Sequence, residues 1–147
     1  MSMGFEFRET MSGSYHRIGA SDRELAIAFT VRAVAHDWLR FLRDRKAALT
    51  GEVVVEGLAD HRPLHGTLKI DPLLGRELVY DFEFPADDGR TLRFFGKKSV
   101  ELLRPLHTMT TLPAQLLAVD GEVVGEGRLR FDARSDLLRW LRSFRIV

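Results

Sequence analysis

The chain has 147 residues, of which 45% are hydrophobic and 29% are charged, a balance that is typical of one soluble domain with a sizeable core. Its 22 basic and 21 acidic residues leave a net charge of +1, which gives no overall attraction for nucleic acid or for an anionic membrane. Cysteine is absent, which excludes disulfides, thiolate catalysis and cysteine-based zinc sites.

Nothing near the start of the chain has the pattern of a signal peptide, and no apolar run approaches the roughly 18 residues of a membrane helix. We therefore expect a cytoplasmic protein with no membrane span and no nucleic-acid partner.

Apolar and polar residues alternate along most of the chain, which predicts β-strands with one buried face. After an N-terminal segment, such runs cover residues 25–33, 51–58, 65–71, 77–84, 90–100, 111–119 and 122–133. Asp-Gly pairs within 87–90 and at 120–121 predict tight hairpins, and residues 19–22 predict a third turn. Short connections make neighbouring strands antiparallel, so we expect about eight mostly antiparallel strands.

A set of antiparallel strands must protect its edges. We expect one mainly β domain over residues 1–147, in which the strands close into a lipocalin-like barrel. A β-sandwich of two packed sheets is the alternative.

Two similar octapeptides interrupt the alternation, DWLRFLRD at 37–44 and DLLRWLRS at 136–143. Helical spacing of their apolar residues predicts two short amphipathic helices with arginines toward water. The apolar positions are Trp38, Leu39, Phe41, Leu42 and Leu49 in the first, and Leu137, Leu138, Trp140, Leu141 and Phe144 in the second. Each octapeptide follows a strand that ends in Ala, so one explanation is an internal strand–helix duplication of 25–49 and 122–146. Convergence of two helices that cover the same kind of surface is the other.

Histidine and lysine near the predicted strand ends are candidate ligand contacts. On a strand, His107 and Thr111 share one face and Thr110 lies on the other. An inward His107 among hydroxyls would bind the polar end of a ligand or act as an acid or base near neutral pH. The alternative is a surface histidine beside threonines that favour strands.

Gly96 interrupts the strand pattern of FFGKKS at 94–99, where an inward Lys97 or Lys98 would hold an anionic group. A solvated lysine pair that protects a sheet edge is the alternative. His61 and His65 are four residues apart, but Pro63 between them predicts a solvated loop and no metal site.

Several words of the sequence resemble a known family. They are MSGSY at 11–15, FGKKSV at 95–100, MTTL at 109–112 and RSFR at 142–145. In this order they resemble a small β-rich accessory domain found in bacterial proteins beside cholesterol-oxidase-like flavoproteins of the glucose–methanol–choline class and beside α/β-hydrolases. The family pattern has Asp where this chain has Lys98. The resemblance implies a flavoprotein oxidase or hydrolase partner and implies no catalytic residue.

Nucleophile elbows, phosphate loops and dinucleotide fingerprints are absent from the sequence, so we assign no cofactor and no catalytic residue. Our first hypothesis is a binding or accessory module for an apolar, lipid- or steroid-like ligand. Its polar contacts would be Tyr15, Lys97, His107, Thr110 and Thr111. The alternatives are an interaction domain that forms homo-oligomers and, third, a small cofactor-free enzyme that uses His107.

Overall fold

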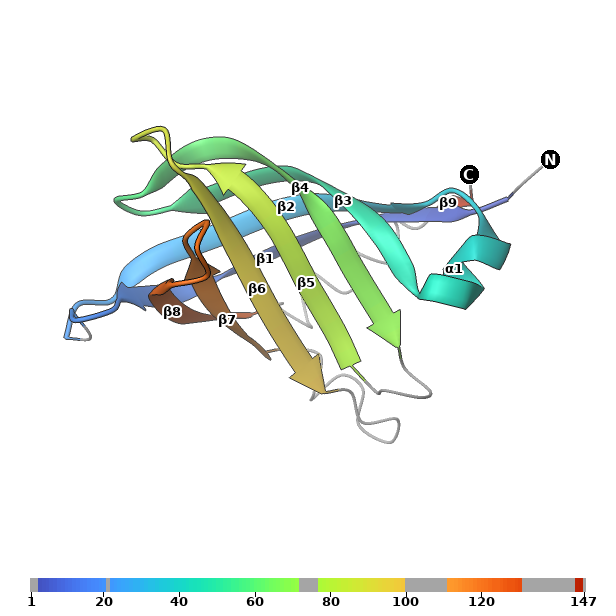
Figure 1. Cartoon of the computed structure of the whole chain (residues 1–147). Coiled ribbons are helices and arrows are strands. Elements are labelled where there is room, and N and C mark those ends of the chain that lie inside the picture. The colour runs from blue at the N-terminus through green and yellow to red at the C-terminus, as the bar shows by residue number, and fades with distance from the viewer. Residues whose placement is uncertain (1–2, 21, 72–76, 100–110, 131–144, 147) are drawn as a thin grey trace.

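The computed structural model describes residues 3–20, 22–71, 77–99, 111–130 and 145–146 (Figure 1). In these ranges the chain forms nine strands and one helix. Their bounds are β1 Phe5–Arg17, β2 Leu25–Ala35, α1 Trp38–Asp44, β3 Lys46–Val55, β4 Ala59–Asp71, β5 Glu77–Pro85, β6 Thr91–Ser99, β7 Thr111–Leu117, β8 Val123–Arg130 and β9 Arg145–Ile146.

Eight of these strands close into an antiparallel barrel. Strands β1 to β8 pair in sequence order, and β8 returns to pair with β1 from Ser12↔Arg130 to Arg17↔Gly125. The two-residue strand β9 pairs with the start of β1 at Phe5 and Glu6. The predicted closed barrel is therefore confirmed, and the β-sandwich is excluded.

The three predicted turns connect consecutive strands at one end of the barrel, which we call the hairpin end (Figure 1). Gly19, Gly89 and Gly121 have φ of +87°, +91° and +89°, a conformation that glycine adopts without a steric penalty. The opposite end carries α1, β9 and the start of β1, and we call it the helix end (Figure 1).

Helix α1 is shorter than the sequence pattern predicted. Asp37 caps its N-terminus, accepting from the backbone N–H of Leu39 at 2.9 Å, and Arg45 ends it in a left-handed conformation with φ of +61°. Leu49, predicted on the helix, lies instead in β3 and is buried. The second predicted helix, 136–143, lies outside the described residues.

The helix also meets the core differently from the prediction. Only Phe41 among its residues is buried, whereas Trp38, Leu39 and Leu42 are 38%, 75% and 53% exposed. A helix of two turns laid against the end of a barrel turns only one narrow stripe inward, so the expected broad apolar contact does not form.

Two predicted boundaries are corrected in β3 and β4. The run at 51–58 is not a separate strand, because β3 begins at Lys46 and the chain turns at Gly57, with φ of +82°. The predicted loop around His61 and Pro63 lies inside β4, where a register shift between Val53 and Val55 of β3 accommodates the extra residue.

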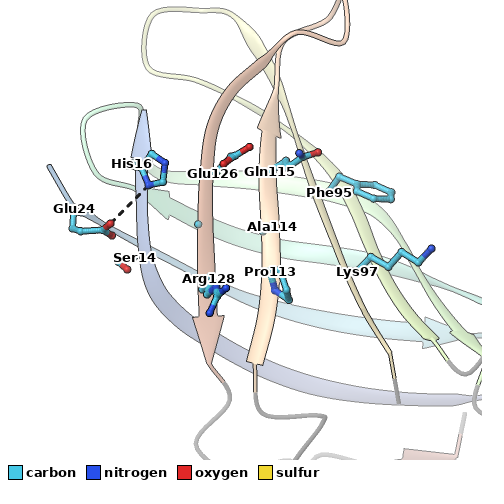
Figure 2. A pocket seen from close by; sticks show the side chains of 11 residues that line it. Ser14, His16, Glu24, Phe95, Lys97, Pro113, Ala114, Gln115, Glu126 and Arg128 are labelled. Carbon is cyan, nitrogen blue, oxygen red and sulfur yellow. Dashed lines mark ion pairs between the residues drawn. The ribbon is translucent and has the colours of Figure 1, made fainter. Parts of the chain in front are cut away.

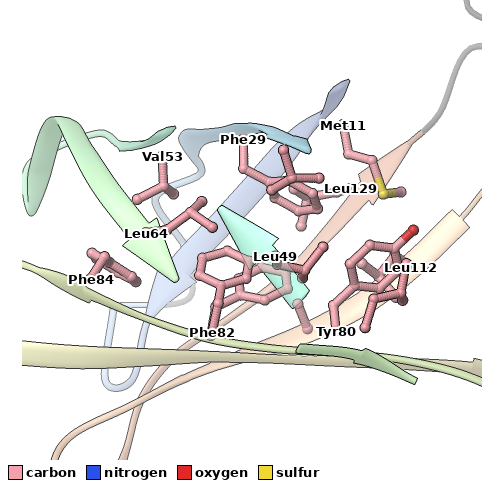
Figure 3. Packing of buried hydrophobic residues seen from close by; sticks show 14 of the residues in the cluster. Met11, Phe29, Leu49, Val53, Leu64, Tyr80, Phe82, Phe84, Leu112 and Leu129 are labelled. Carbon is pink, nitrogen blue, oxygen red and sulfur yellow. The ribbon is translucent and has the colours of Figure 1, made fainter. Parts of the chain in front are cut away.

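Aromatic rings from three strands meet in the core toward the hairpin end (Figure 3). The rings of Phe82 and Phe94 stack at 4.6 Å, and Phe29 contacts each of them edge-on at 5.4 Å. Such pairs add to the hydrophobic stabilisation from burial.

None of the helices in the described residues is long and apolar enough to cross a membrane.

Candidate functional site

A group of polar side chains lies inside the barrel, and we call it the interior cluster. It consists of Glu9 of β1, Tyr80 of β5 and Lys98 of β6. The Tyr80 hydroxyl donates to both Glu9 carboxylate oxygens, at 2.7 Å and 2.9 Å. Lys98 is 7% exposed and is the one buried charged residue in the part of the chain that the structure describes.

Strand alternation explains why these three side chains point inward. Glu9 follows Phe5 and Phe7 on one face of β1, while Tyr80 precedes Phe82 on the inner face of β5. Lys98 follows the same alternation on β6. Residues 71 positions apart in the chain are thus brought to hydrogen-bonding distance by barrel closure.

Burial shifts the proton equilibria of the interior cluster. Desolvation raises the pKa of Glu9, although the hydrogen bond from Tyr80 and the charge of Lys98 both act to lower it. Desolvation and the neighbouring Glu9 carboxylate hold the pKa of Tyr80 well above its usual range. Desolvation lowers the pKa of Lys98, and Glu9 opposes that change. Tyr80 therefore remains a hydrogen-bond donor at neutral pH.

The barrel wall beside the interior cluster has small side chains on β2 and β3. Buried Ala33 and Ala35 lie opposite Phe7 and Phe5 of β1, and buried Ala47 lies opposite Leu68, the β4 partner of Tyr80. Phe5 of β1 and Phe41 of α1 pack edge to face at 4.9 Å at the helix end. An apolar wall next to convergent polar groups is the usual composition of a small-molecule site.

The residues predicted from sequence are not gathered at the interior cluster. Tyr15 is buried, and its hydroxyl donates to the backbone carbonyl of Glu56 near the hairpin end. Lys97 lies on the outer surface, where its ammonium is 3.1 Å from the Glu77 carboxylate, so Lys98 is the inward member of the pair. Thr111 is half-buried and lies opposite Arg130 of β8. His107 and Thr110 lie outside the described residues.

Glu9 was missed by the sequence analysis, although the signal was present. In FEFRETM, Glu9 occupies a position of the apolar face between Phe7 and Met11. A charged residue at a position predicted to be buried is the observation that identifies such a site.

A second feature is a groove of about 570 Å³ on the outer surface of β1, β6, β7 and β8 (Figure 2). Lys97 is one of the residues that line it. The others are Ser14, His16, Glu24, Phe95, Pro113, Ala114, Gln115, Glu126, Gly127 and Arg128.

A metal centre is not supported by the described part of the chain, which contains no group of three or more histidine, aspartate or glutamate side chains placed to hold an ion. Comparison of the chain with protein-family models, with curated proteins and with solved structures found no match. The pairing of its strands defines the chain as an eight-stranded antiparallel barrel.

Proposed function

We propose that this protein binds a small lipid- or steroid-like molecule inside the barrel, in the manner of a lipocalin-like carrier. The observation that carries this proposal is the interior cluster, three convergent polar side chains among buried residues that are otherwise apolar in the described ranges. Barrels of eight strands have room for interior side chains or for one small ligand.

The chemistry of the cluster selects the polar group of the ligand. Lys98 carries hydrogen-bond donors, whereas the Glu9 carboxylate already accepts from the Tyr80 hydroxyl. A ligand that presents an oxygen acceptor, either a carboxylate or a ketone, is complementary to the Lys98 ammonium group. Its apolar body would pack toward Ala33, Ala35 and Ala47, because the hairpin end is filled by phenylalanine rings.

Thermal unfolding in the presence of ligand tests this proposal. The probes are a long-chain fatty acid, a 3-keto steroid and a 3-hydroxy sterol, which separate carboxylate, ketone and hydroxyl recognition. A probe at a hundred times its Kd stabilises the fold by about 2.7 kcal/mol, a shift of about 5–10 °C for a chain of this size.

Lys98→Met should abolish the shift for the recognised probe. Lys69→Met is the matched control, because Lys69 is a strand lysine whose partner, Glu77, lies 3.7 Å away on the outer surface. If none of the probes shifts the unfolding temperature, or if both variants respond as the wild type does, the interior is not a site of this kind.

A second candidate function is an interaction domain, and one observation favours it. Of the seven exposed large hydrophobic residues in the described ranges, five lie at the helix end. These are Met3, Trp38, Leu39, Leu42 and Ile146. Met3 accepts a hydrogen bond from the Trp38 backbone at 2.8 Å, and Ile146 pairs with Phe5, so the five belong to one region.

An apolar surface of this kind is typical of a protein–protein contact. We expect a homodimer at high concentration that Leu39→Ser with Leu42→Ser converts to a monomer, measured by light scattering during gel filtration. A wild-type chain that stays monomeric at every concentration would exclude self-association through this surface.

A further inference from the structure

The outer groove is organised as two parallel rows of side chains that cross the strands (Figure 2). The pairing registers place Ser14 opposite Arg128 and Arg128 opposite Pro113, which forms the first row. Lys97 extends this row, one residue beyond the last β6–β7 pair, Gly96↔Ala114.

The second row lies two residues further along each strand. It runs from Phe95 to Gln115, Glu126 and His16, each opposite the next across the sheet. Glu24 continues it, with its carboxylate 3.8 Å from the His16 ring (Figure 2).

Small residues form the floor between the rows. Gly127 pairs with Ala114 on one side and with Tyr15 on the other. A Cβ atom on Gly127 would come within 2.4 Å of the Ser14 carbonyl oxygen, so only glycine allows this close approach of β8 to β1.

The two rows carry opposite charges. The first has Arg128 and Lys97, whose ammonium is also 3.1 Å from Glu77 beside the groove, whereas the second has Glu24 and Glu126. Arg128 and Glu126 are neighbours on one face of β8, yet neither forms an ion pair with any residue in the described ranges. Two charged groups of opposite sign are therefore presented to the same groove without neutralising each other.

This arrangement excludes simple ions as good ligands. A purely anionic molecule bound by Arg128 would meet the carboxylates of Glu126 and Glu24, and a purely cationic one would meet Arg128 and Lys97. Rows two residues apart are separated by ~7 Å. Two hydrogen bonds of ~2.8 Å each take up most of this separation, so the ligand's two charged groups must lie close together in the molecule.

We propose that this groove binds a small zwitterion, whose carboxylate or phosphate group contacts Arg128 and Lys97 and whose ammonium group contacts Glu126. Phe95 and Pro113 supply apolar surface for the remainder of the ligand at one side of the groove. This proposal is independent of ligand binding inside the barrel, because the groove lies on the outer face of the wall.

Titration of the protein, followed by amide chemical shifts in NMR spectra, tests the proposal. The zwitterionic probes are L-phenylalanine and phosphoethanolamine, which distinguish a carboxylate from a phosphate. 3-Phenylpropionate lacks the ammonium group of phenylalanine, and 2-phenylethylamine lacks its carboxylate. We expect at least one zwitterion to shift the amides of Gln115, Glu126 and Gly127 and to bind more tightly than either single-charge analogue.

Two substitutions separate the roles of the rows. Arg128→Gln should weaken the zwitterion and 3-phenylpropionate alike, about five- to tenfold, because a charge-assisted contact is lost. Glu126→Gln should weaken the zwitterion to a similar extent and leave 3-phenylpropionate unchanged or slightly tighter. Arg62→Gln is the control, since Arg62 pairs with Asp87 at 2.8 Å away from the groove.

Three results would overturn the proposal. The first is the absence of shifts at these amides with both zwitterions at millimolar concentration. The second is binding of the single-charge analogues as tight as that of the zwitterions. The third is zwitterion binding that neither substitution weakens.

Discussion

The hydrogen bond between Tyr80 and Glu9 can be tested against a matched bond in the same protein. Tyr80 and Tyr15 are both buried, at 2% and 1% exposed, and both donate through the hydroxyl. Their acceptors differ, because Tyr80 donates to a carboxylate and Tyr15 donates to a neutral backbone carbonyl. Replacing each tyrosine by phenylalanine removes only the hydroxyl and keeps the ring.

The magnitudes follow from the acceptors. A hydrogen bond to a charged group contributes about 1.5–3 kcal/mol, and one between neutral groups contributes about 0.5–1.5 kcal/mol. We therefore expect Tyr80→Phe to lower the free energy of unfolding by about twice as much as Tyr15→Phe at neutral pH. For a chain of this length the larger loss corresponds to about 3–12 °C in Tm.

The two variants should also differ in their dependence on pH. Glu9 has a raised pKa in the folded protein, and the Tyr80 hydroxyl acts to lower it, so Tyr80→Phe raises that pKa further. A carboxyl group with a raised folded-state pKa loses stability as pH increases from its unfolded pKa through its folded pKa. Over this pH range Tyr80→Phe loses more unfolding free energy than the wild type does. The destabilisation caused by the substitution therefore grows with pH and is small in acid.

Urea unfolding of both variants and the wild type, between acid and neutral pH, measures these differences. Tyr15→Phe should show a constant cost across the range, because its acceptor does not titrate. A Tyr80→Phe cost that is equally independent of pH would refute the assignment of an ionised Glu9 as the acceptor.

Three further predictions concern the framework. Phe41→Ala should lower the free energy of unfolding by about 3–5 kcal/mol, and Trp38→Ala by about half as much, because Phe41 is buried and Trp38 is 38% exposed. Equal losses in urea unfolding would contradict the packing described for α1. Asp37→Ala should cost about 0.5–2 kcal/mol through loss of the N-cap, and a neutral effect on Tm would show that α1 does not depend on this residue. Gly127→Ala should lower the free energy of unfolding by about 1–3 kcal/mol, and Gly125→Ala by less. The nearest atom to an added Cβ lies at 2.4 Å for Gly127 and at 3.2 Å for Gly125. The reverse order of the two losses would contradict the strand geometry of β8.

The strands of the barrel were predictable because the apolar residues that alternate in the sequence are the residues buried on the inner faces of the strands. On β5, for example, the predicted inward face of Leu78, Tyr80, Phe82 and Phe84 is the buried face in the structure. The Asp-Gly hairpins were equally predictable, since their glycines take the positive φ angles that such turns need.

The extent of α1 was not predictable in the same way. Arg45 ends the helix in a left-handed conformation that is more often taken by glycine, so no stop signal appears in the sequence. Leu49 lies at helical spacing from the apolar residues of α1 only by chance. It alternates with Ala47 on the buried face of β3.

The interior cluster could be predicted only in part. Alternation places Glu9, Tyr80 and Lys98 on inward faces one strand at a time, but the contact between Glu9 and Tyr80 depends on barrel closure between residues 71 positions apart. Spacing along the sequence does not show which inward residues of distant strands lie at the same height along the barrel axis.

The desolvation of the interior cluster supports the proposal that it serves ligand binding. The stacked rings of Phe29, Phe82 and Phe94 already provide an apolar core toward the hairpin end. Glu9 and Lys98, by contrast, each have a pKa shifted by desolvation in the direction that disfavours the charged form, so the fold holds both at a cost. Apolar residues of similar volume in place of buried charged groups are often neutral or stabilising. The desolvation cost of Glu9 and Lys98 therefore supports the proposal that the interior cluster contacts the polar group of a ligand.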